Sequence, residues 1–176
     1  MTAFDDKVSI FYFGEWLKGY YFRKGKTVID AMNESRAKHG EILAQCAAFD
    51  RKLKSDCEKV GADYYTLACA ALRQSVGAHK LVENAKGNLL FLSKECDSNG
   101  CIGTADVSYP SIPLYLIYNP ELVNAMMTGI FDFAKMPVWT FDFAPHDIGT
   151  YPWCIGQVYS IRNANAKYSC DMTCFG

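Results

Sequence analysis

Residues 27–60, TVIDAMNESRAKHGEILAQCAAFDRKLKSDCEKV, form the clearest periodic segment of the sequence. Apolar residues recur every three or four positions from Ile42 to Val60, which is the spacing of one face of a helix. Thr27 is suited to be the N-cap of this helix, and Gly61 is suited to end it in a left-handed conformation. We therefore expect one long helix of roughly 50 Å, at about 1.5 Å per residue.

Four further segments carry patterns of secondary structure. Residues 63–82, DYYTLACAALRQSVGAHKLV, predict a second helix, and their many small side chains lead us to expect that it is buried. Residues 83–95 combine turn residues with a short apolar strand and predict a hairpin. Residues 119–136 predict a third helix that begins with an Asn-Pro pair. The aromatic residues 7–22 are also expected to be helical, so the expected fold is mainly α, with one small β-hairpin and long loops.

The composition is that of an ordinary folded protein. Of its 176 residues, 50% are hydrophobic and 21% are charged, which fits one domain spanning residues 1–176. The net charge of −1 and the lack of a basic stripe argue against nucleic acid as a partner. No apolar run reaches the roughly 18 residues needed to cross a bilayer, so no membrane partner is expected.

The two ends of the sequence lead to a further expectation. The first residues, MTAFDDKVSI, lack the basic and apolar regions of a signal peptide. The last residues, YSCDMTCFG, form neither a helix end nor a charged tail. We expect the chain to be a fragment of a longer multidomain protein.

The sequence contains eight cysteines, fewer than a disulfide scaffold of this length would carry. Cys96 and Cys101 could close a local ring around DSNG, and Cys170 and Cys174 could pair or lie along one helical turn. Neither the doubled C-x-x-C spacing nor flanking histidines of a zinc site are present, so no metal and no cofactor are expected. Three cysteines at apolar helical positions are expected to be packed thiols: Cys46, Cys57 and Cys69.

Two loops rich in glycine and proline are candidates for function, because long loops in compact domains usually carry it. The first is residues 93–111, SKECDSNGCIGTADVSYPS, which could present Glu95 and Asp106 toward a common pocket. The second is residues 143–152, FAPHDIGTYP, in which a proline and a glycine bracket an adjacent histidine and aspartate.

The acids and the histidine of these loops are the residue types that acid/base hydrolysis needs. One group must donate a proton while another stays ionised to activate water or to stabilise charge. Sequence spacing gives no distances, and aspartates beside serine, threonine and glycine commonly cap turns instead. Ser93 and Lys94 do not form a nucleophile pair, because neighbouring residues of a strand point to opposite faces.

Several motifs in the same order are more specific. They are the segment at 63–82, FLSKECDSNGCIGTADVSYPSIPLYLIYNPELV at 91–123, the loop FAPHDIGTYP, and GQVY at 156–159. Together they resemble the central region of the glutaminase A-type family, known from secreted fungal glutaminases and related bacterial proteins. The resemblance departs after Met172, where the family continues with a Val-Glu-Glu run and this chain has TCFG.

The resemblance implies a helical architecture related to the six-hairpin (α/α) toroid glycosidases. It implies that a C-terminal domain of the same parent chain completes the toroid and is therefore a partner. It also implies hydrolysis of a small-molecule substrate, L-glutamine, to L-glutamate and ammonia by a secreted or periplasmic parent protein.

The matching motifs are S-K-E-x-x-S-N-G, D-V-x-Y-P and P-H-D-x-G-x-Y-P. The residues expected to be catalytic are Glu95, Asp106, His146 and Asp147. The three carboxylates would frame the pocket, while the histidine would polarise the substrate or orient an acid. A cation, Arg73 or Lys94, would bind the α-carboxylate of an amino acid. The residues expected to bind substrate are Arg73, Lys94, Asn99, Tyr109 and Tyr151.

Two other functions remain open from the sequence. A glycoside hydrolase shares the toroid and needs two carboxylates with aromatic platforms, for which Trp139, Tyr151 and Trp153 are available. A non-catalytic scaffold would use the aromatic residues 7–22 to dock a C-terminal (α/α) domain. An open groove with stacked aromatic rings would favour a sugar, whereas a closed site beside a guanidinium would favour an amino acid.

Overall fold

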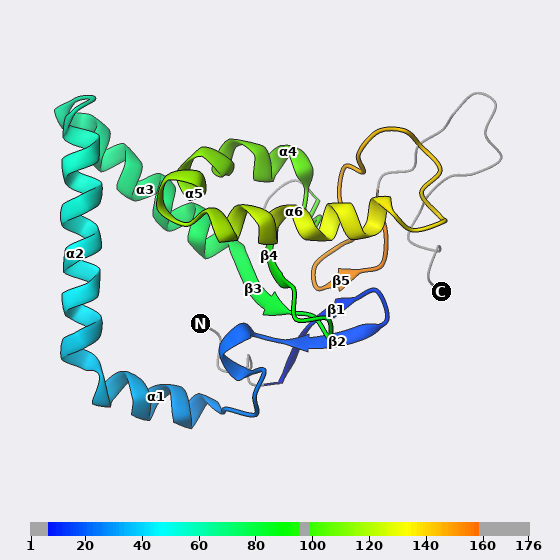
Figure 1. Cartoon of the computed structure of the whole chain (residues 1–176), viewed down its shortest axis with the longest axis horizontal. Coiled ribbons are helices and arrows are strands. Elements are labelled where there is room, and N and C mark those ends of the chain that lie inside the picture. The colour runs from blue at the N-terminus through cyan, green and yellow to red at the C-terminus, as the bar shows by residue number, and fades with distance from the viewer. Residues whose placement is uncertain (1–6, 96–98, 159–176) are drawn as a thin grey trace.

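The computed structural model describes residues 7–95 and 99–158 as a mainly helical chain with two small sheets (Figure 1). In chain order the elements are β1 (Val8–Tyr12), β2 (Glu15–Lys18), the 3-10 turn η1 (Tyr20–Phe22), α1 (Val28–Ala37), α2 (His39–Glu58), α3 (Ala62–Ala78), β3 (His79–Glu83), β4 (Leu89–Ser93), α4 (Ala105–Ser108), the 3-10 turn η2 (Tyr109–Ser111), α5 (Ile112–Tyr118), α6 (Pro120–Ala134) and β5 (Trp153–Cys154).

Helices α1, α2 and α3 form an arm that extends away from the strands (Figure 1). Thr27 begins α1 as expected, in a capping box in which it and Asp30 bond to each other's backbone amides. The expectation of one helix over residues 27–60 is wrong, because the chain leaves the helical conformation at Lys38, with φ −100° and ψ 15°. Gly40, a poor helix former, lies two residues after Lys38, in the first turn of α2. Gly61 is extended, with φ 166°, and not left-handed as expected.

The expectation that the second helix is buried is also wrong. Helix α3 contains no buried residue, and it ends at Ala78, after which the chain continues as strand β3. Among the described residues of the arm, only Leu53 and Cys57 are buried. The small side chains of α3 thus pack against α2 over a limited area. Large apolar side chains of the arm that stay exposed are Ile29, Met32, Ile42, Leu43, Val60, Tyr64, Leu67 and Val76.

The N-terminal segment is a β-hairpin, which corrects the expectation of a helix. Strands β1 and β2 pair antiparallel, and β5 adds to β1 in parallel. Phe13 and Gly14 connect β1 to β2 with positive φ values of 43° and 102°, as a two-residue type I′ turn requires. Burial alternates along β1, with Ile10 and Tyr12 facing the core, so the period is two and not 3.6.

The core lies where α6 crosses the hairpin of β3 and β4 and meets the N-terminal sheet (Figure 1). The predicted hairpin is present, although its strands span residues 79–93 and not 83–95, and the predicted helix starts at Pro120. Gly129 on α6 leaves room for Ile148, because a Cβ atom at this position would lie 2.9 Å from Ile148 Cδ1. Within the described ranges, no helix combines the length and the apolar character needed to span a membrane.

Candidate active site

The two candidate loops pair with each other. Ile102 N donates to Gly149 O at 2.8 Å, and Ile148 N donates to Ile102 O at 3.1 Å. Ala105 N also donates to His146 O at 2.7 Å. Ile102 and Ile148 are both fully buried in the main core, which fixes the position of the polar residues beside them. Residues 41 or more positions apart in the chain thus become neighbours.

His146 lies between two carboxylates. Its Nδ1 is 2.9 Å from Oδ2 of Asp147, and its Nε2 is 3.7 Å from Oδ1 of Asp106. The side chain of Asp147 is fully buried, whereas that of Asp106 is 75% exposed. One end of the imidazole therefore faces the protein interior, and the other faces a carboxylate that solvent and substrate can reach.

Asp147 is anchored by backbone amides. Its Oδ1 accepts hydrogen bonds from Gly149 N at 3.0 Å and from Val158 N at 2.8 Å. The amide of His146 donates to Oε1 of the buried Gln157 at 2.7 Å. These bonds compensate the burial of a carboxylate and leave its Oδ2 directed at the imidazole.

Glu95 and Lys94 extend the cluster from the end of strand β4. Glu95 N donates to Cys101 O at 2.8 Å, and Glu95 Oε2 accepts from the buried Thr104 hydroxyl at 3.3 Å. Lys94 Nζ lies 5.3 Å from the centre of the Tyr151 ring, in a cation–π contact. One cation and one further carboxylate therefore lie beside the paired loops.

The Cys101 thiol is fully buried beside these acids. Burial, together with the negative charges of Asp147 and Glu95, raises the pKa of Cys101 to about 12. A thiol of this kind stays protonated near neutral pH, and only the thiolate is a good nucleophile. The Cys101 thiol is therefore a poor nucleophile in this arrangement.

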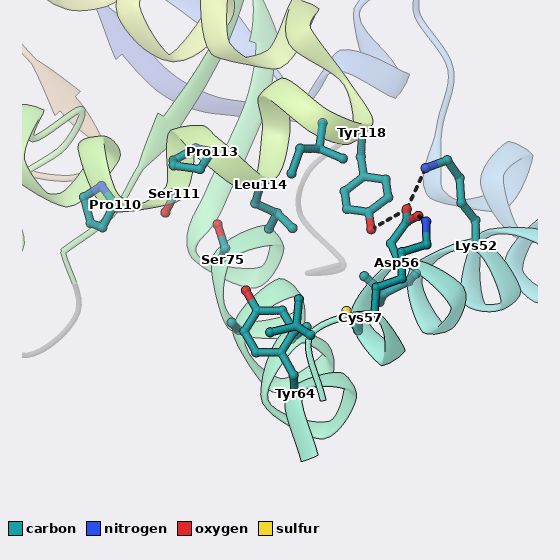
Figure 2. Close-up of a pocket in the computed structure, with 16 residues that line it drawn as sticks. Lys52, Asp56, Cys57, Tyr64, Ser75, Pro110, Ser111, Pro113, Leu114 and Tyr118 are labelled. Atoms are coloured by element: carbon teal, nitrogen blue, oxygen red, sulfur yellow. Dashed lines mark hydrogen bonds and ion pairs between the residues drawn. The ribbon is translucent and has the colours of Figure 1, made fainter. Parts of the chain in front are cut away.

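A separate cavity of about 690 Å³ lies between α2, α3 and α5 (Figure 2). At its polar end, Asp56 is bonded to Lys52 Nζ at 2.8 Å and to the Tyr118 hydroxyl at 3.2 Å. Hydrogen bonds from Lys52 and Lys59 lower the pKa of Asp56 to about 2. The ionised groups of this cavity are thus paired with each other, and no histidine is among the described residues that line it. It offers space but not an acid/base pair.

The chain was compared with known proteins. The model of the family described as the glutaminase A six helical-hairpin domain matches residues 61–173, which is more than half of the chain. The chain belongs to this glutaminase A family. Glutaminase A of Aspergillus oryzae is 34% identical to it over 109 residues, which are 61% of this chain and 16% of that protein. A protein named "Probable glutaminase" from Arthroderma benhamiae is 29% identical over 104 residues, 58% of this chain and 12% of that protein.

These matches cover a small part of each relative, so the chain spans well under two thirds of the length of the glutaminases it matches. No solved structure matches the chain.

In this glutaminase A domain, the paired loops gather the four residues expected to be catalytic, while the expected substrate-binding residues are spread more widely. Asn99 orders the first loop, since its Oδ1 accepts from Cys101 N at 2.8 Å. Tyr109 follows α4 and is 76% exposed. Arg73 lines a hollow between α2 and α3, on the helical arm.

Sequence reasoning missed three residues that shape this site of the glutaminase A domain: Cys101, Thr104 and Gln157. From the sequence, Cys101 is expected only to close a possible ring with Cys96. Cys96, Cys170 and Cys174 lie outside the described residues. The Cys101 thiol is free, as are Cys46, Cys57 and Cys69, although Cys46 is exposed and not packed. The signal that could have found Cys101 is its position after the Asn-Gly turn, on the strand-like stretch that meets the second loop.

Proposed function

We propose that the paired loops form the active site of a glutaminase, which hydrolyses the side-chain amide of L-glutamine to L-glutamate and ammonia. One observation carries this proposal: His146 lies between the buried Asp147 and the exposed Asp106. A carboxylate that solvent reaches, held beside an oriented imidazole, is a suitable acid/base centre. The names of the related fungal proteins support L-glutamine as the substrate.

In this proposal Asp106 carries the proton transfers. Its carboxylate takes a proton from water as the water oxygen bonds to the amide carbon. The same proton then passes to the amide nitrogen as the C–N bond breaks and ammonia leaves. His146 orients Asp106 from its Nε2 side, while Asp147 fixes the imidazole through Nδ1.

Lys94 and Glu95 are proposed to bind the amino-acid end of the substrate. Glutamine carries an α-carboxylate and an α-ammonium group, which require a cation and an anion close together. Lys94 lies against Tyr151, and Glu95 is anchored by Thr104, both beside the paired loops. Lys94 replaces Arg73 as the preferred carboxylate anchor, because Arg73 lies on the helical arm.

The toroid is a further part of this proposal. Helices α1, α2 and α3 expose large apolar side chains. In a folded protein, such side chains are normally covered by other elements or by a partner. In a six-hairpin toroid, each hairpin packs against its neighbours, so we propose that further hairpins and a C-terminal domain of the parent chain cover these faces. We likewise propose that the parent protein is secreted or periplasmic, because the sequence resembles secreted fungal glutaminases.

A glycosidase is the competing function. Of the aromatic residues considered as sugar platforms, Trp139 is buried and its Nε1 donates to Phe143 O at 2.8 Å, so it belongs to the core. Trp153 is exposed, but it packs against Phe11 and Trp16 of the N-terminal hairpin. Of the three candidate platforms, Tyr151 alone then remains beside the paired loops, next to Lys94, and the lack of a second platform favours the amidase proposal.

The test is ammonia release from L-glutamine by the natural full-length protein and its Asp106→Asn variant. We expect Asp106→Asn to lower kcat by at least about 100-fold, because it removes the proton acceptor. Asp142→Asn, at an exposed aspartate outside the cluster, is the matched control and should leave kcat unchanged.

Two results would overturn the proposal. Asp106→Asn could release ammonia at the rate of the unmodified protein, which would remove Asp106 from the mechanism. Alternatively, the unmodified protein could release no ammonia and cleave aryl glycosides in an Asp106-dependent manner, which would establish the glycosidase.

A further inference from the structure

The paired loops bring three different donor atoms together. The Cys101 sulfur, a ring nitrogen of His146 and a carboxylate oxygen of Asp147 all lie within 4.8 Å of one another. Within this set, His146 Nδ1 and Asp147 Oδ2 are 2.9 Å apart. Cys101 and Asp147 are buried, while His146 lies at the boundary with solvent. We propose that these three side chains bind one Zn²⁺ ion.

The donor set selects zinc over the hard cations. Thiolate and imidazole are ligands that Zn²⁺ prefers, whereas Mg²⁺ and Ca²⁺ take oxygen ligands. Zinc–ligand distances of about 2.0–2.3 Å place tetrahedral donors roughly 3.3–3.7 Å apart, so the farthest pair here must close by at most about 1.5 Å. Three protein ligands leave a fourth position open, which is the arrangement of catalytic zinc sites.

Backbone and side-chain bonds already hold all three donors in place. Asp147 uses Oδ1 to accept two backbone amides, which leaves Oδ2 for the ion. The amide of Cys101 donates to Asn99 Oδ1, and the amide of His146 donates to Gln157 Oε1. Outer contacts of this kind orient metal ligands and raise affinity.

The charge around the thiol also favours a cation. Asp147, Glu95 and Asp106 all place negative charge close to Cys101. A dication between them would offset this repulsion. Its binding would release the proton between His146 Nδ1 and Asp147 Oδ2 and the proton of the Cys101 thiol to solvent, while Nε2 of His146 would still face Asp106.

In the reaction, the ion would supply Lewis-acid chemistry that lowers the pKa of a bound water, while Asp106 would stay on the Nε2 side of the imidazole. This role rests on the proposed function, whereas the binding of the ion does not. The two can therefore be tested separately.

The test is a cobalt titration of the natural full-length protein after metal removal by a chelator. Co²⁺ serves as the spectroscopic probe, because a thiolate ligand produces an intense charge-transfer absorption. We expect this absorption to saturate at one ion per chain and to disappear when Zn²⁺ is added. Cys101→Ser should abolish it, and Cys154→Ser, at another buried thiol outside the donor set, should retain it.

A second pair of variants covers the case in which Cys101→Ser does not fold. His146→Asn, at a partly exposed side chain, should weaken Zn²⁺ binding at least about tenfold. His39→Asn, at an exposed histidine of the arm, should bind Zn²⁺ as the unmodified protein does.

No charge-transfer absorption in the unmodified protein, or equal absorption in Cys101→Ser, would overturn the zinc site. Absorption that depends on Cys101 without ammonia release would support the zinc site and refute the proposed function. Undiminished ammonia release by the chelated protein, without absorption on cobalt addition, would support the proposed function and refute the zinc site.

Discussion

At the scale of single residues, His79 at the junction of α3 and β3 links stability to pH. Its ring stacks on Phe91 with centroids 4.4 Å apart, and its Nδ1 is 2.6 Å from Ser75 O. Its Nε2 is buried and has no hydrogen-bond partner among the described residues. Burial lowers the pKa of His79, although the Ser75 carbonyl opposes this effect. The folded protein therefore holds a neutral imidazole that the unfolded chain protonates more readily.

We predict that His79→Gln reduces the loss of stability in mild acid. Because the folded-state pKa lies below the unfolded value of about 6.5, the unfolded chain binds more protons as the pH falls, and the free energy of unfolding falls with it. Urea denaturation at about pH 7.5 and about pH 5.5 measures this loss. Equal losses in the variant and the unmodified protein would show that another group controls this pH range.

Gly149 is the residue of the second loop that tolerates substitution least. Its φ of 142° is unfavourable for other residues, and a Cβ atom there would overlap the Trp153 carbonyl. We predict that Gly149→Ala lowers the free energy of unfolding by at least about 3 kcal/mol. Gly77→Ala, inside α3 with open space around its Cβ position, should raise it by about 1 kcal/mol. Thermal unfolding of both variants measures these changes in the free energy of unfolding. A small loss of stability in Gly149→Ala would contradict the close packing at this loop.

At the scale of elements, sequence patterns predicted turns and helix starts better than the extent of whole elements. The Asn-Pro start of α6 and the turn before β4 were predicted, because both rest on local turn and cap chemistry. The N-terminal hairpin was missed, since closely spaced aromatic residues fit either period. Its Phe13-Gly14 turn and the alternation of Ile10 and Tyr12 were the signals for strands. The break in the long helix was missed because the apolar periodicity that predicted the helix begins only at Ile42, after the break at Lys38.

The contact between α2 and the rest of the molecule is concentrated at one end. Leu53 is 2% exposed, whereas Leu43 on the same helix is 55% exposed. We predict that Leu53→Ala lowers the free energy of unfolding by about 2–5 kcal/mol. Leu43→Ala should cost less than about 1 kcal/mol. Denaturant unfolding compares the two variants, and similar costs would show that another surface covers the outer part of α2.

At the scale of the whole molecule, the candidate site could be predicted as a set of residues but not as an arrangement. The motifs identified Glu95, Asp106, His146 and Asp147, yet their loops come together only through long-range backbone bonds, which sequence spacing does not predict. The role of Cys101 was not predicted, because the function of a single cysteine depends on neighbours in space that the sequence does not show. Arg73 was included because its charge suited a carboxylate, and nothing in the sequence showed that it lies on the exposed arm.

The most direct test of the proposed active site is to measure kcat/KM for L-glutamine in the natural full-length protein and in two histidine variants of it. His146 lies between Asp106 and Asp147, while His39 lies on the exposed arm. We predict that His146→Asn lowers kcat/KM by at least about 100-fold, and that His39→Asn leaves it unchanged. A folded His146→Asn protein that hydrolyses glutamine at the unmodified rate would show that the paired loops are not the active site.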